Sequence, residues 1–374
     1  MRVLILSANT GGGHNSTARS LAERFEQLGA ACDIADTLAF ISEKVSDFIS
    51  RGHSYVYRTF PKLFGAGYHF EETHPPRFLY ELCAMGAESL NQRLTEEQYD
   101  AVLCVHTFSG MMMTEVRNRF GNPIPCYFVA TDYTASPGVT EMVADGYFVP
   151  HEMLFEEFMR AGVPADKMFA SGIPVRKEFY EKKSKQEARL ALGLPTEGRM
   201  ILLGCGSMGC GKLEKSSLLL LEHLPEDSYL VVLCGSNKKS YEALQPYLSP
   251  RLFAVSFTDR VPDYMSAADL YITKPGGLTT SEAIVKRTPM VFYNAVSGCE
   301  TRNFNFLVKM GVATGGKTWR QVGALASHAL CHPEVIEQQT VAMESFLQHR
   351  TVEYICNRVM EKFEEDEKLL IKKD

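Results

Sequence analysis

The sequence of 374 residues lacks any hydrophobic run long enough to cross a membrane, and it has no CxxC pair among its ten cysteines. The longest stretch without Asp, Glu, Lys or Arg, Val3–Ala18, is mostly glycine and polar residues, whereas a spanning helix needs about 18 apolar residues. The beginning of the chain has neither the apolar core nor the cleavage site of a signal peptide. We therefore expect a cytoplasmic protein with free thiols.

Excess positive charge is also missing. The chain has 39 Lys and Arg against 45 Asp and Glu, a net charge of −6, and a pI near 6.0. A protein with this balance has no overall field that attracts nucleic acid, so we expect no nucleic-acid partner. Apolar residues make up 45% and charged residues 22%, which is typical of a globular protein and excludes general disorder.

What the chain does contain is two series of short apolar runs that alternate with amphipathic segments. The first series predicts helices at 16–28 and 110–119 and strands at 3–6, 32–36, 101–106 and 125–130. The second predicts strands at 200–205, 229–233, 252–255, 270–273 and 290–293, with helices between them. Strands joined by helices form parallel sheets covered on both faces. The predicted fold class is α/β, with two Rossmann-like, doubly wound domains that face each other across a cleft.

The domain boundaries follow from where this alternation is interrupted. A segment with a proline near each end and a lysine cluster, 172–195, predicts a linker with a short helix. It separates an N-terminal domain at 1–171 from a C-terminal domain at 196–350. Residues 351–374 predict a charged helix that is long enough to pack back on the N-terminal domain.

A glycine-rich turn follows the first predicted strand. Gly11, Gly12 and Gly13 precede a predicted helix, and backbone N–H groups at a helix start favour anionic ligands. The turn is not the dinucleotide motif GxGxxG, because Ser16 occupies the third glycine position. His14 directly follows the glycines, where an imidazole is well placed to act as a general base. The alternative is a tight turn that binds no ligand, with a structural histidine.

Two further glycine-rich turns follow strands of the second series. The turn at 204–211 is not a P-loop, because Leu213 follows Lys212 where Ser or Thr is required. The turn at 274–277 leads into a helix that Thr279 and its neighbours could cap. We expect Glu282 in the first turn of that helix, either as a cap or as an acceptor of hydrogen bonds from a ribose diol. The turn at 204–211 predicts a phosphate cradle, with a ligand-free turn as the alternative.

At this point the motifs resemble a known family. GGGH after the first strand, TD at 131–132, FTDRVPDYMSAADLYITKPGGLTTSEA and SGCETRN together resemble the monogalactosyldiacylglycerol synthase group of glycosyltransferase family 28. This family includes the bacterial processive diacylglycerol glucosyltransferases. The resemblance runs from Met1 to about Ala313. It implies a GT-B fold, with the acceptor in the N-terminal domain and a UDP-sugar in the C-terminal domain.

The resemblance also implies an inverting transfer that needs no metal or other cofactor. Cys299 stands where the family commonly has Gln, and Asn15 stands where plant members have Arg. The residues that the resemblance assigns to the donor lie in the second series: the uracil near Phe257 and Val261, the ribose at Glu282, the diphosphate at Ser207, Met208, Gly209, Gly277, Leu278 and Thr279, and the sugar at Glu300 and Asn303.

An inverting transfer needs a base that takes the proton of the acceptor hydroxyl. His14 is our first candidate. Asp132, at the end of a predicted strand, is the second, either as the base or as the partner that orients His14. Asp132 could instead be a turn or cap residue.

A segment between Arg51 and Phe70 has six aromatic and three basic residues and no acidic residue. Interleaved rings and cations suit the surface of an anionic membrane, although several rings could be core residues. The predicted membrane contacts are Arg51, Tyr55, Arg58, Phe60, Lys62 and Phe64.

These observations predict a transfer of a hexose from a UDP-sugar to diacylglycerol or a related lipid at the inner face of the cell membrane. The alternatives are a UDP-sugar epimerase of the same architecture, a transferase with a different acceptor, and a non-catalytic binding protein.

Overall fold

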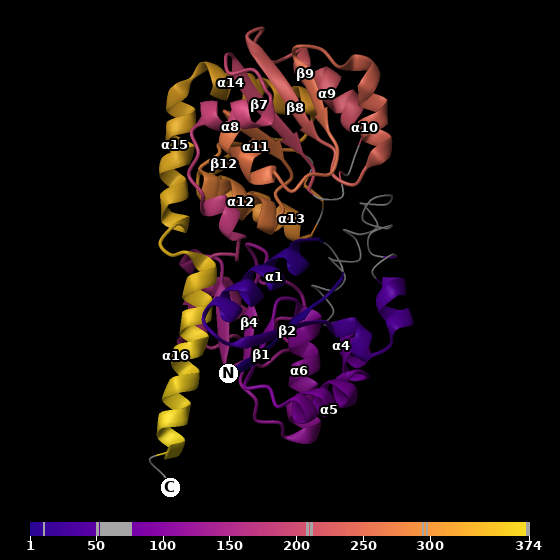
Figure 1. Ribbon diagram of the computed structural model, residues 1–374, viewed down its shortest axis with the longest axis vertical. Coiled ribbons are helices and arrows are strands. Elements are labelled where there is room, and N and C mark those ends of the chain that lie inside the picture. Colours follow the sequence, from indigo (N-terminus) through magenta and orange to yellow (C-terminus); the bar gives the residue numbers. More distant parts are fainter. Residues whose placement is uncertain are drawn as a thin grey trace. The chain divides into compact units, whose positions relative to one another are not determined.

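The computed structural model describes residues 1–9, 12–49, 52, 77–206, 209, 212–293, 295, 296 and 298–371. The chain forms two compact units, one of Met1–Arg176 with His349–Asp374 and one of Lys177–Gln348 (Figure 1). Each unit is built on a parallel six-stranded sheet. The prediction of two doubly wound parallel sheets is confirmed.

The first unit has the strand order β2-β1-β3-β4-β5-β6 within its described residues. The strands are β1 (Arg2–Ser7), β2 (Ala31–Asp36), β3 (Ala101–Cys104), β4 (Cys126–Val129), β5 (Gly146–Val149) and β6 (Met168–Ala170). All residues of β3, β4 and β5 are buried, because helices cover both faces of a parallel sheet. The first four strands agree with the prediction, whereas β5 and β6 were not predicted.

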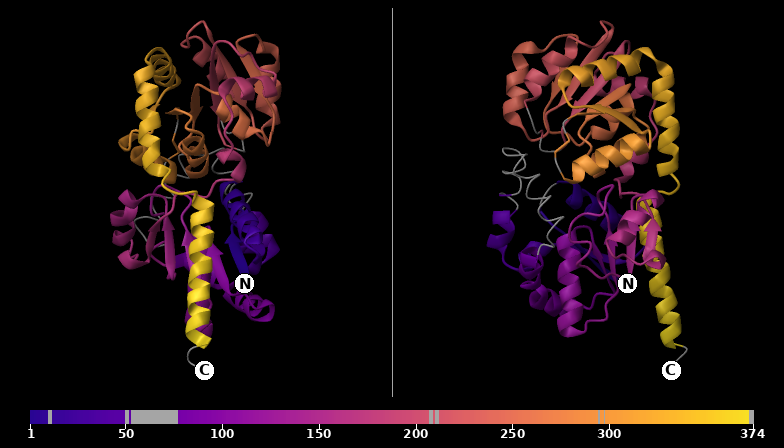
Figure 2. Two further views of the ribbon diagram at one scale, coloured as in Figure 1. Left: turned by 60° about the vertical axis from the view of Figure 1, so that its left-hand side comes forward. Right: turned by 180° about the vertical axis from the view of Figure 1, so that it is seen from behind.

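Helices from both ends of the chain cover this sheet. Helices with described bounds are α1 (Gly12–Gln27), α4 (Arg77–Ala84), α5 (Ala87–Glu97), α6 (Thr107–Phe120), α7 (Phe155–Arg160) and α16 (Thr351–Ile371). Leu21 and Phe25 of α1 share one buried apolar cluster with Ile355 and Val359 of α16. Figure 2 shows α16, in yellow, lying along the sheet of its own unit. The last helix of the chain is therefore part of the N-terminal core.

The second unit has the strand order β12-β11-β10-β7-β8-β9 within its described residues. The strands are β7 (Arg199–Gly204), β8 (Ser228–Leu233), β9 (Leu252–Val255), β10 (Leu270–Thr273), β11 (Met290–Tyr293) and β12 (Ala313–Gly316). Its helices are α8 (Lys185–Leu192), α9 (Leu213–Leu221), α10 (Lys238–Leu244), α11 (Val261–Ala267), α12 (Gly277–Lys286), α13 (Cys299–Lys309), α14 (Trp319–Cys331) and α15 (Pro333–Met343). The five predicted strands are confirmed, and β12 was missed.

The segment predicted as a linker, 172–195, is mostly a folded part of the second unit. Helix α8 begins with a capping box between Ser184 and Glu187. Arg189 is buried, and its guanidinium donates to Asp269 at 2.6 Å and to the carbonyl oxygen of Ala267 at 3.0 Å. The division between the units falls at Arg176 and Lys177 rather than across the whole charged stretch.

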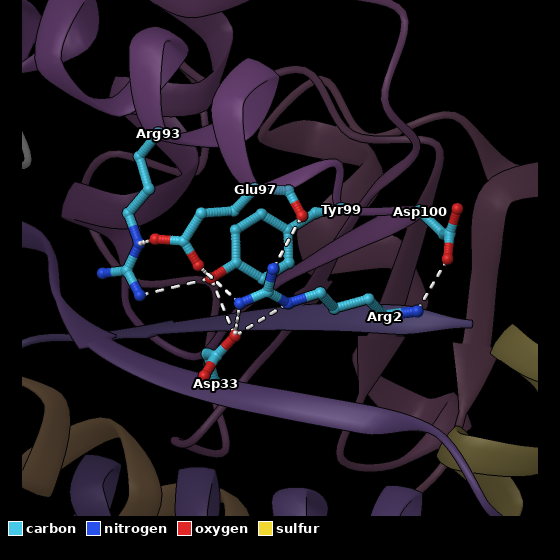
Figure 3. Close-up of polar contacts among 6 residues, drawn as sticks. All are labelled: Arg2, Asp33, Arg93, Glu97, Tyr99 and Asp100. Carbon is cyan, nitrogen blue, oxygen red and sulfur yellow. Dashed lines mark hydrogen bonds and ion pairs between the residues drawn. The ribbon is translucent and has the colours of Figure 1, made fainter.

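A polar cluster joins the amino ends of the strands in the first sheet (Figure 3). Arg2, at the start of β1, donates to Asp33 of β2 at 2.9 Å and to Glu97 of α5 at 2.5 Å. Its backbone N–H donates to Asp100, directly before β3, at 2.6 Å. The hydroxyl of Tyr99 lies 2.9 Å from the same Asp33 oxygen. These contacts fix the amino edge of the sheet, opposite the edge where ligands of such sheets bind.

The strand orders locate that binding edge. In a doubly wound sheet, ligands bind at the carboxyl ends of the strands, where the chain switches from one half of the sheet to the other. In the first unit this point lies between β1 and β3. In the second unit it lies between β7 and β10. The glycine-rich turns of the sequence follow β1, β7 and β10, so each leaves the sheet at a switch point.

Candidate functional site

The first unit brings three turns together around His14. Helix α1 begins at Gly12, four residues earlier than predicted, so His14 lies in its first turn. The Nδ1 atom of His14 lies 2.9 Å from the carbonyl oxygen of Val105, which follows β3. The same atom lies 3.1 Å from Oγ1 of Thr131, which follows β4. The imidazole is thus held by the ends of two neighbouring strands.

These contacts fix where the ring carries its hydrogen. A carbonyl oxygen only accepts hydrogen bonds, so Nδ1 of His14 must be protonated to bond to Val105. In the neutral ring, Nε2 is then the bare, basic nitrogen. The arrangement leaves Nε2 as the atom of His14 that can accept a proton from a substrate.

The surroundings of His14 also keep the ring neutral. Burial disfavours the charged imidazolium and lowers the pKa of His14 below its ordinary value of 6.5, although the hydrogen bond to Val105 acts in the opposite direction. A histidine of this kind is unprotonated at neutral pH. It is therefore ready to act as a general base.

Asp132, the second candidate, lies next to Thr131 in the loop after β4. In the described part of the chain, the hydrogen-bond partners of His14 are Val105 and Thr131. The loop is anchored further on, because the N–H of Ala135 donates to Glu157 of α7 at 2.9 Å. The TD pair stood out in the sequence, whereas the contacts of Thr131 and of the Val105 carbonyl with His14 were missed.

The glycine turn before His14 is braced by side-chain amides. Gly12 and Gly13 lie in the first turn of α1, which contains no acidic residue, and Gly11 lies outside the described residues. Asn15 accepts a hydrogen bond from the Ser7 hydroxyl at 2.7 Å, and its amide donates to Asn9 at 2.7 Å. The start of α1 is thus held against the end of β1, with backbone N–H groups available for an anion.

A second imidazole lies beside His14. The ring centroids of His14 and His106 are 4.6 Å apart, with an angle of 70° between the rings. His106 is the N-cap of α6, and its Nδ1 accepts a hydrogen bond from the N–H of Phe108 at 3.1 Å. No role was predicted for His106 from the sequence.

In the second unit, the turn after β7 requires glycine. Gly209 has φ +57°, and a Cβ there would lie 1.9 Å from the carbonyl oxygen of Cys234. The side-chain amide of Asn237 donates to the Gly209 carbonyl at 2.7 Å and ties the turn to the start of α10. The predicted diphosphate residues Ser207 and Met208 lie outside the described residues.

The side chain of Asn303 holds the turn after β10 in place. This side chain, on α13, is 0% exposed, and its amide donates to the carbonyl oxygen of Pro275 at 3.0 Å. Gly277, Leu278 and Thr279 form the first turn of α12 directly after Pro275 and Gly276. Asn303, which the resemblance assigns to the sugar, thus also holds this turn in place.

Glu282 differs from the prediction in its place on the helix. Gly276 is the N-cap of α12 and makes no side-chain capping bond, and no acidic residue lies in the first turn. Glu282 is in the second turn and is 8% exposed. The expected position in the first turn was wrong, because the helix begins before the Thr-Thr-Ser segment that was thought to cap it. The capping alternative for Glu282 is therefore excluded.

The remaining predicted donor residues lie in loops and helix starts of the second unit. Glu300 is in the first turn of α13 and accepts a hydrogen bond from the N–H of Val296 at 2.7 Å. Phe257 lies in the loop after β9 and is 62% exposed, and Val261 is the first residue of α11. The exposed ring of Phe257 can stack on a flat ligand such as a nucleobase, and the start of α11 at Val261 follows four residues later.

The predicted membrane contacts cannot be placed in this fold, because Arg51, Tyr55, Arg58, Phe60, Lys62 and Phe64 lie outside the described residues. Among the helices that are described, none is long and apolar enough to cross a membrane. Within the same residues, no group of three or more His, Cys, Asp or Glu is placed to hold a metal ion.

Two family models match the chain in succession. The model of monogalactosyldiacylglycerol (MGDG) synthase matches residues 14–175, and that of the glycosyltransferase family 28 C-terminal domain matches residues 200–308. Together with the fold, these matches define the class: the chain is a glycosyltransferase. More particularly, its N-terminal part matches an MGDG synthase domain and its C-terminal part matches a family 28 C-terminal domain.

Curated relatives agree with this assignment. A processive diacylglycerol beta-glucosyltransferase of Bacillus licheniformis is 26% identical, over 97% of this chain and 95% of the relative. The enzyme of the same name from Bacillus subtilis is 29% identical, over 83% of this chain and 82% of the relative.

Solved structures share the fold. MurG of Acinetobacter baumannii matches with a TM-score of 0.64 and 17% identity, over 96% of this chain and 99% of that chain. A UDP-GlcNAc 2-epimerase of Neisseria meningitidis matches with a TM-score of 0.63 and 13% identity, over 96% and 100%. At these identities the likeness shows the GT-B fold, which transferases and epimerases have in common.

Proposed function

We propose that this protein transfers a hexose from a UDP-sugar to diacylglycerol or a related lipid, with inversion at the anomeric carbon. The names of the relatives support the lipid acceptor, since they are diacylglycerol glucosyltransferases over nearly the full chain. The observation that carries the proposal is the imidazole of His14, held at the switch point with Nε2 as its basic atom.

In the proposed reaction, the acceptor hydroxyl attacks the anomeric carbon of the donor. The new bond joins the acceptor oxygen to that carbon, and the bond from the carbon to the diphosphate oxygen breaks. The hydroxyl proton passes to Nε2 of His14, and UDP leaves with the bonding electrons. Because the nucleophile and the leaving group lie on opposite sides of the carbon, a single displacement of this kind inverts its configuration.

The second unit supplies groups suited to the UDP part of the donor. The turns after β7 and β10 bring backbone N–H groups and the start of α12 to one switch point. Such groups stabilise the negative charge of a departing diphosphate, so the proposed reaction needs no metal ion or other cofactor. Glu282 is mostly buried and is not a cap, which favours its carboxylate as an acceptor of hydrogen bonds from the ribose hydroxyls.

A lipid acceptor requires access to a membrane surface, so we also propose peripheral association with the inner face of the cell membrane. Phe48 and Met85 are exposed apolar side chains that precede and follow the aromatic and basic segment in sequence. Rings and cations in that segment suit an interface with anionic lipid.

The test is to incubate the purified protein with a panel of UDP-hexoses, with and without vesicles that contain diacylglycerol, and to identify products by mass spectrometry. A glycolipid made from one donor supports the proposal, and its anomeric configuration tests inversion. The variant His14→Ala should lose at least about a hundredfold in rate while UDP still binds. His328→Ala, an exposed histidine of the second unit, is the matched control.

The second candidate function is epimerisation of a UDP-sugar, which the fold of the Neisseria meningitidis epimerase favours. Conversion of the donor to an isomer without any acceptor would support the epimerase. Release of UDP without a glycolipid would support the UDP-sugar as donor and contradict the lipid as acceptor. Absence of turnover and of UDP binding would reject both functions.

A further inference from the structure

A chain of hydrogen bonds between side chains runs from the end of β1 to the end of β2. The Ser7 hydroxyl donates to the side-chain oxygen of Asn15 at 2.7 Å, and the Asn15 amide donates to the side-chain oxygen of Asn9 at 2.7 Å. The Asn9 amide donates in turn to the carboxylate of Asp36 at 3.0 Å. Asn15 directly follows His14 in α1, so this chain of bonds connects the helix that carries His14 to two neighbouring strands.

Asp36 determines the direction of these bonds. An ionised carboxylate only accepts hydrogen bonds, so Asn9 must turn its amide N–H to Asp36 and its oxygen to Asn15. Asn15 must then turn its own amide N–H to Asn9, which leaves its oxygen to accept from the Ser7 hydroxyl. Each bond therefore orients the next side chain, from the carboxylate to the start of α1.

The carboxylate of Asp36 is itself held from two other sides. The backbone N–H of Leu38 donates to it at 3.3 Å, which makes Asp36 the N-cap of the short helix η1 (Thr37–Phe40). The hydroxyl of Ser46, a residue that is 7% exposed, also donates to it. These two bonds fix the position of the oxygen atoms to which Asn9 donates.

We propose that Asp36 is a positioning residue for His14 and acts through Asn9 and Asn15. This inference rests on the proposed function. The Nδ1 atom of His14 keeps its bond to the carbonyl oxygen of Val105 only while the start of α1 stays in place. A displacement of about 1 Å in a catalytic group can cost about a hundredfold in rate, so bonds that touch no substrate still affect catalysis.

Two substitutions break the link between Asp36 and Asn9 from opposite sides. Asp36→Ser retains a good N-cap residue, but its side chain is one bond shorter and no longer reaches Asn9. It also removes a negative charge, whereas Asn9→Ala breaks the same link and leaves that charge in place. Each variant should lose about tenfold in kcat/KM for diacylglycerol, with KM for the UDP-sugar unchanged.

The double variant, Asp36→Ser with Asn9→Ala, tests whether the two residues act through one link. If they do, the double variant should also lose only about tenfold, because the first substitution has already broken the link. Independent effects would multiply to a loss of about a hundredfold. That result would overturn the inference.

Ser184→Ala is the matched control for a loss of stability alone. Ser184 is the N-cap of α8 in the second unit, and its hydroxyl accepts a hydrogen bond from the N–H of Glu187 at 3.2 Å. The substitution should lower the Tm, because a helix loses its cap. It should leave kcat/KM for diacylglycerol unchanged.

Nitrogen-15 NMR of the His14 ring gives a readout that does not depend on turnover. In wild type, the bond to Val105 should protect the Nδ1–H of His14 from exchange with water. In Asp36→Ser and in Asn9→Ala this proton should exchange at least about tenfold faster, because the start of α1 opens more often. Ser184→Ala should leave the exchange rate unchanged.

The inference fails if either Asp36→Ser or Asn9→Ala leaves the exchange of the His14 proton as it is in wild type, because the ring is then held without Asp36. It also fails if Ser184→Ala speeds up that exchange as much as the other two substitutions. If wild type forms no glycolipid at all, the proposed function fails, and the exchange rates still test whether Asp36 positions His14.

Discussion

The side-chain amide of Asn303 donates to the carbonyl oxygen of Pro275, 3.0 Å away, although the two residues are 28 positions apart in the chain. This bond connects α13 to the turn that leads from β10 into α12. The turn that we assign to the diphosphate leads into α12, but it is held in place by a side chain of α13.

Replacing Asn303 should test this connection. Asn303→Ala leaves the Pro275 carbonyl without its donor in a buried place, which costs about 1–3 kcal/mol of the free energy of unfolding. We also expect weaker binding of UDP, because the turn loses its support. Chemical denaturation and calorimetric titration with UDP measure the two effects. Asn305→Ala, an exposed position on the same helix, should change neither.

Gly209→Ala should disrupt the turn after β7. The new Cβ would lie 1.9 Å from the carbonyl oxygen of Cys234, so the backbone of the turn must shift. We expect a large loss of affinity for UDP, measured by titration. Gly193→Ala is the control, because Gly193 also has a positive φ but a Cβ added there would meet nothing within 4 Å. Equal effects of the two substitutions would mean that backbone strain, and not the clash, is responsible.

Glu282 should contribute to binding of the donor. Removing a charged acceptor of hydrogen bonds costs about 1.5–3 kcal/mol, so Glu282→Ala should raise KM for the UDP-sugar at least about tenfold. Glu282→Gln keeps the size of the side chain and should show a smaller effect in the same direction. KM for the lipid acceptor should not change. An unaltered KM for the UDP-sugar in both variants would remove Glu282 from the ribose site.

The rate should depend on pH through His14. Burial lowers the pKa of His14 below 6.5, so the basic form persists to a lower pH than in an exposed histidine. We expect kcat/KM for the acceptor to be constant above about pH 6.5 and to fall only below it. The folded state also binds fewer protons than the unfolded state in this range, so the free energy of unfolding should fall as the pH drops below about 6.5. A midpoint of the rate profile above that pH would contradict the assignment of the base.

The polar cluster of Figure 3 should contribute to stability at neutral pH. Burial acts to raise the pKa of Asp33, but hydrogen bonds from Tyr99 and Arg2 outweigh it and hold the pKa below 3.8. Asp33→Asn should therefore destabilise the protein at neutral pH, by less than about 1 kcal/mol because the pair is partly exposed. The difference from wild type should shrink as the pH falls below about 3.8. Denaturation at several pH values checks this, with the exposed Asp166→Asn as control.

The sequence predicted the strands correctly where a local run of residues determines them. Buried apolar runs located β9, β10 and β11 to the residue. Strand β12 was missed because it contains two glycines, which usually indicate a turn. A Cβ at Gly315 would meet Phe304 at 2.4 Å, and one at Gly316 would meet Gln321 at 2.8 Å. Glycine is required at these two positions because neighbouring helices pack closely against the strand, and no local sequence pattern shows that packing.

The candidate site shows the same limit. The glycines before His14 indicated it as the candidate base, but the group that fixes the tautomer of His14 is the backbone carbonyl of Val105, 91 residues away. A carbonyl group has no sequence signal. Thr and Ser residues favour a helix start at their own position, whereas α12 begins at Gly277, so the sequence places Glu282 in the wrong turn. Contacts made by backbone groups therefore could not be predicted from the sequence, and only the structure shows them.

Helix α16 has a consequence for how the protein is made. The N-terminal core includes Ile355, Cys356 and Val359, which are synthesised after the whole of the second unit. During translation, the residues of Lys177–Gln348 can complete their sheet before the first unit receives its last helix. A stop codon shortly after Gln348 would leave the second unit intact and the sheet of the first unit with its apolar surface exposed. Quality-control proteases would then degrade the truncated protein, because the first unit is unstable without α16.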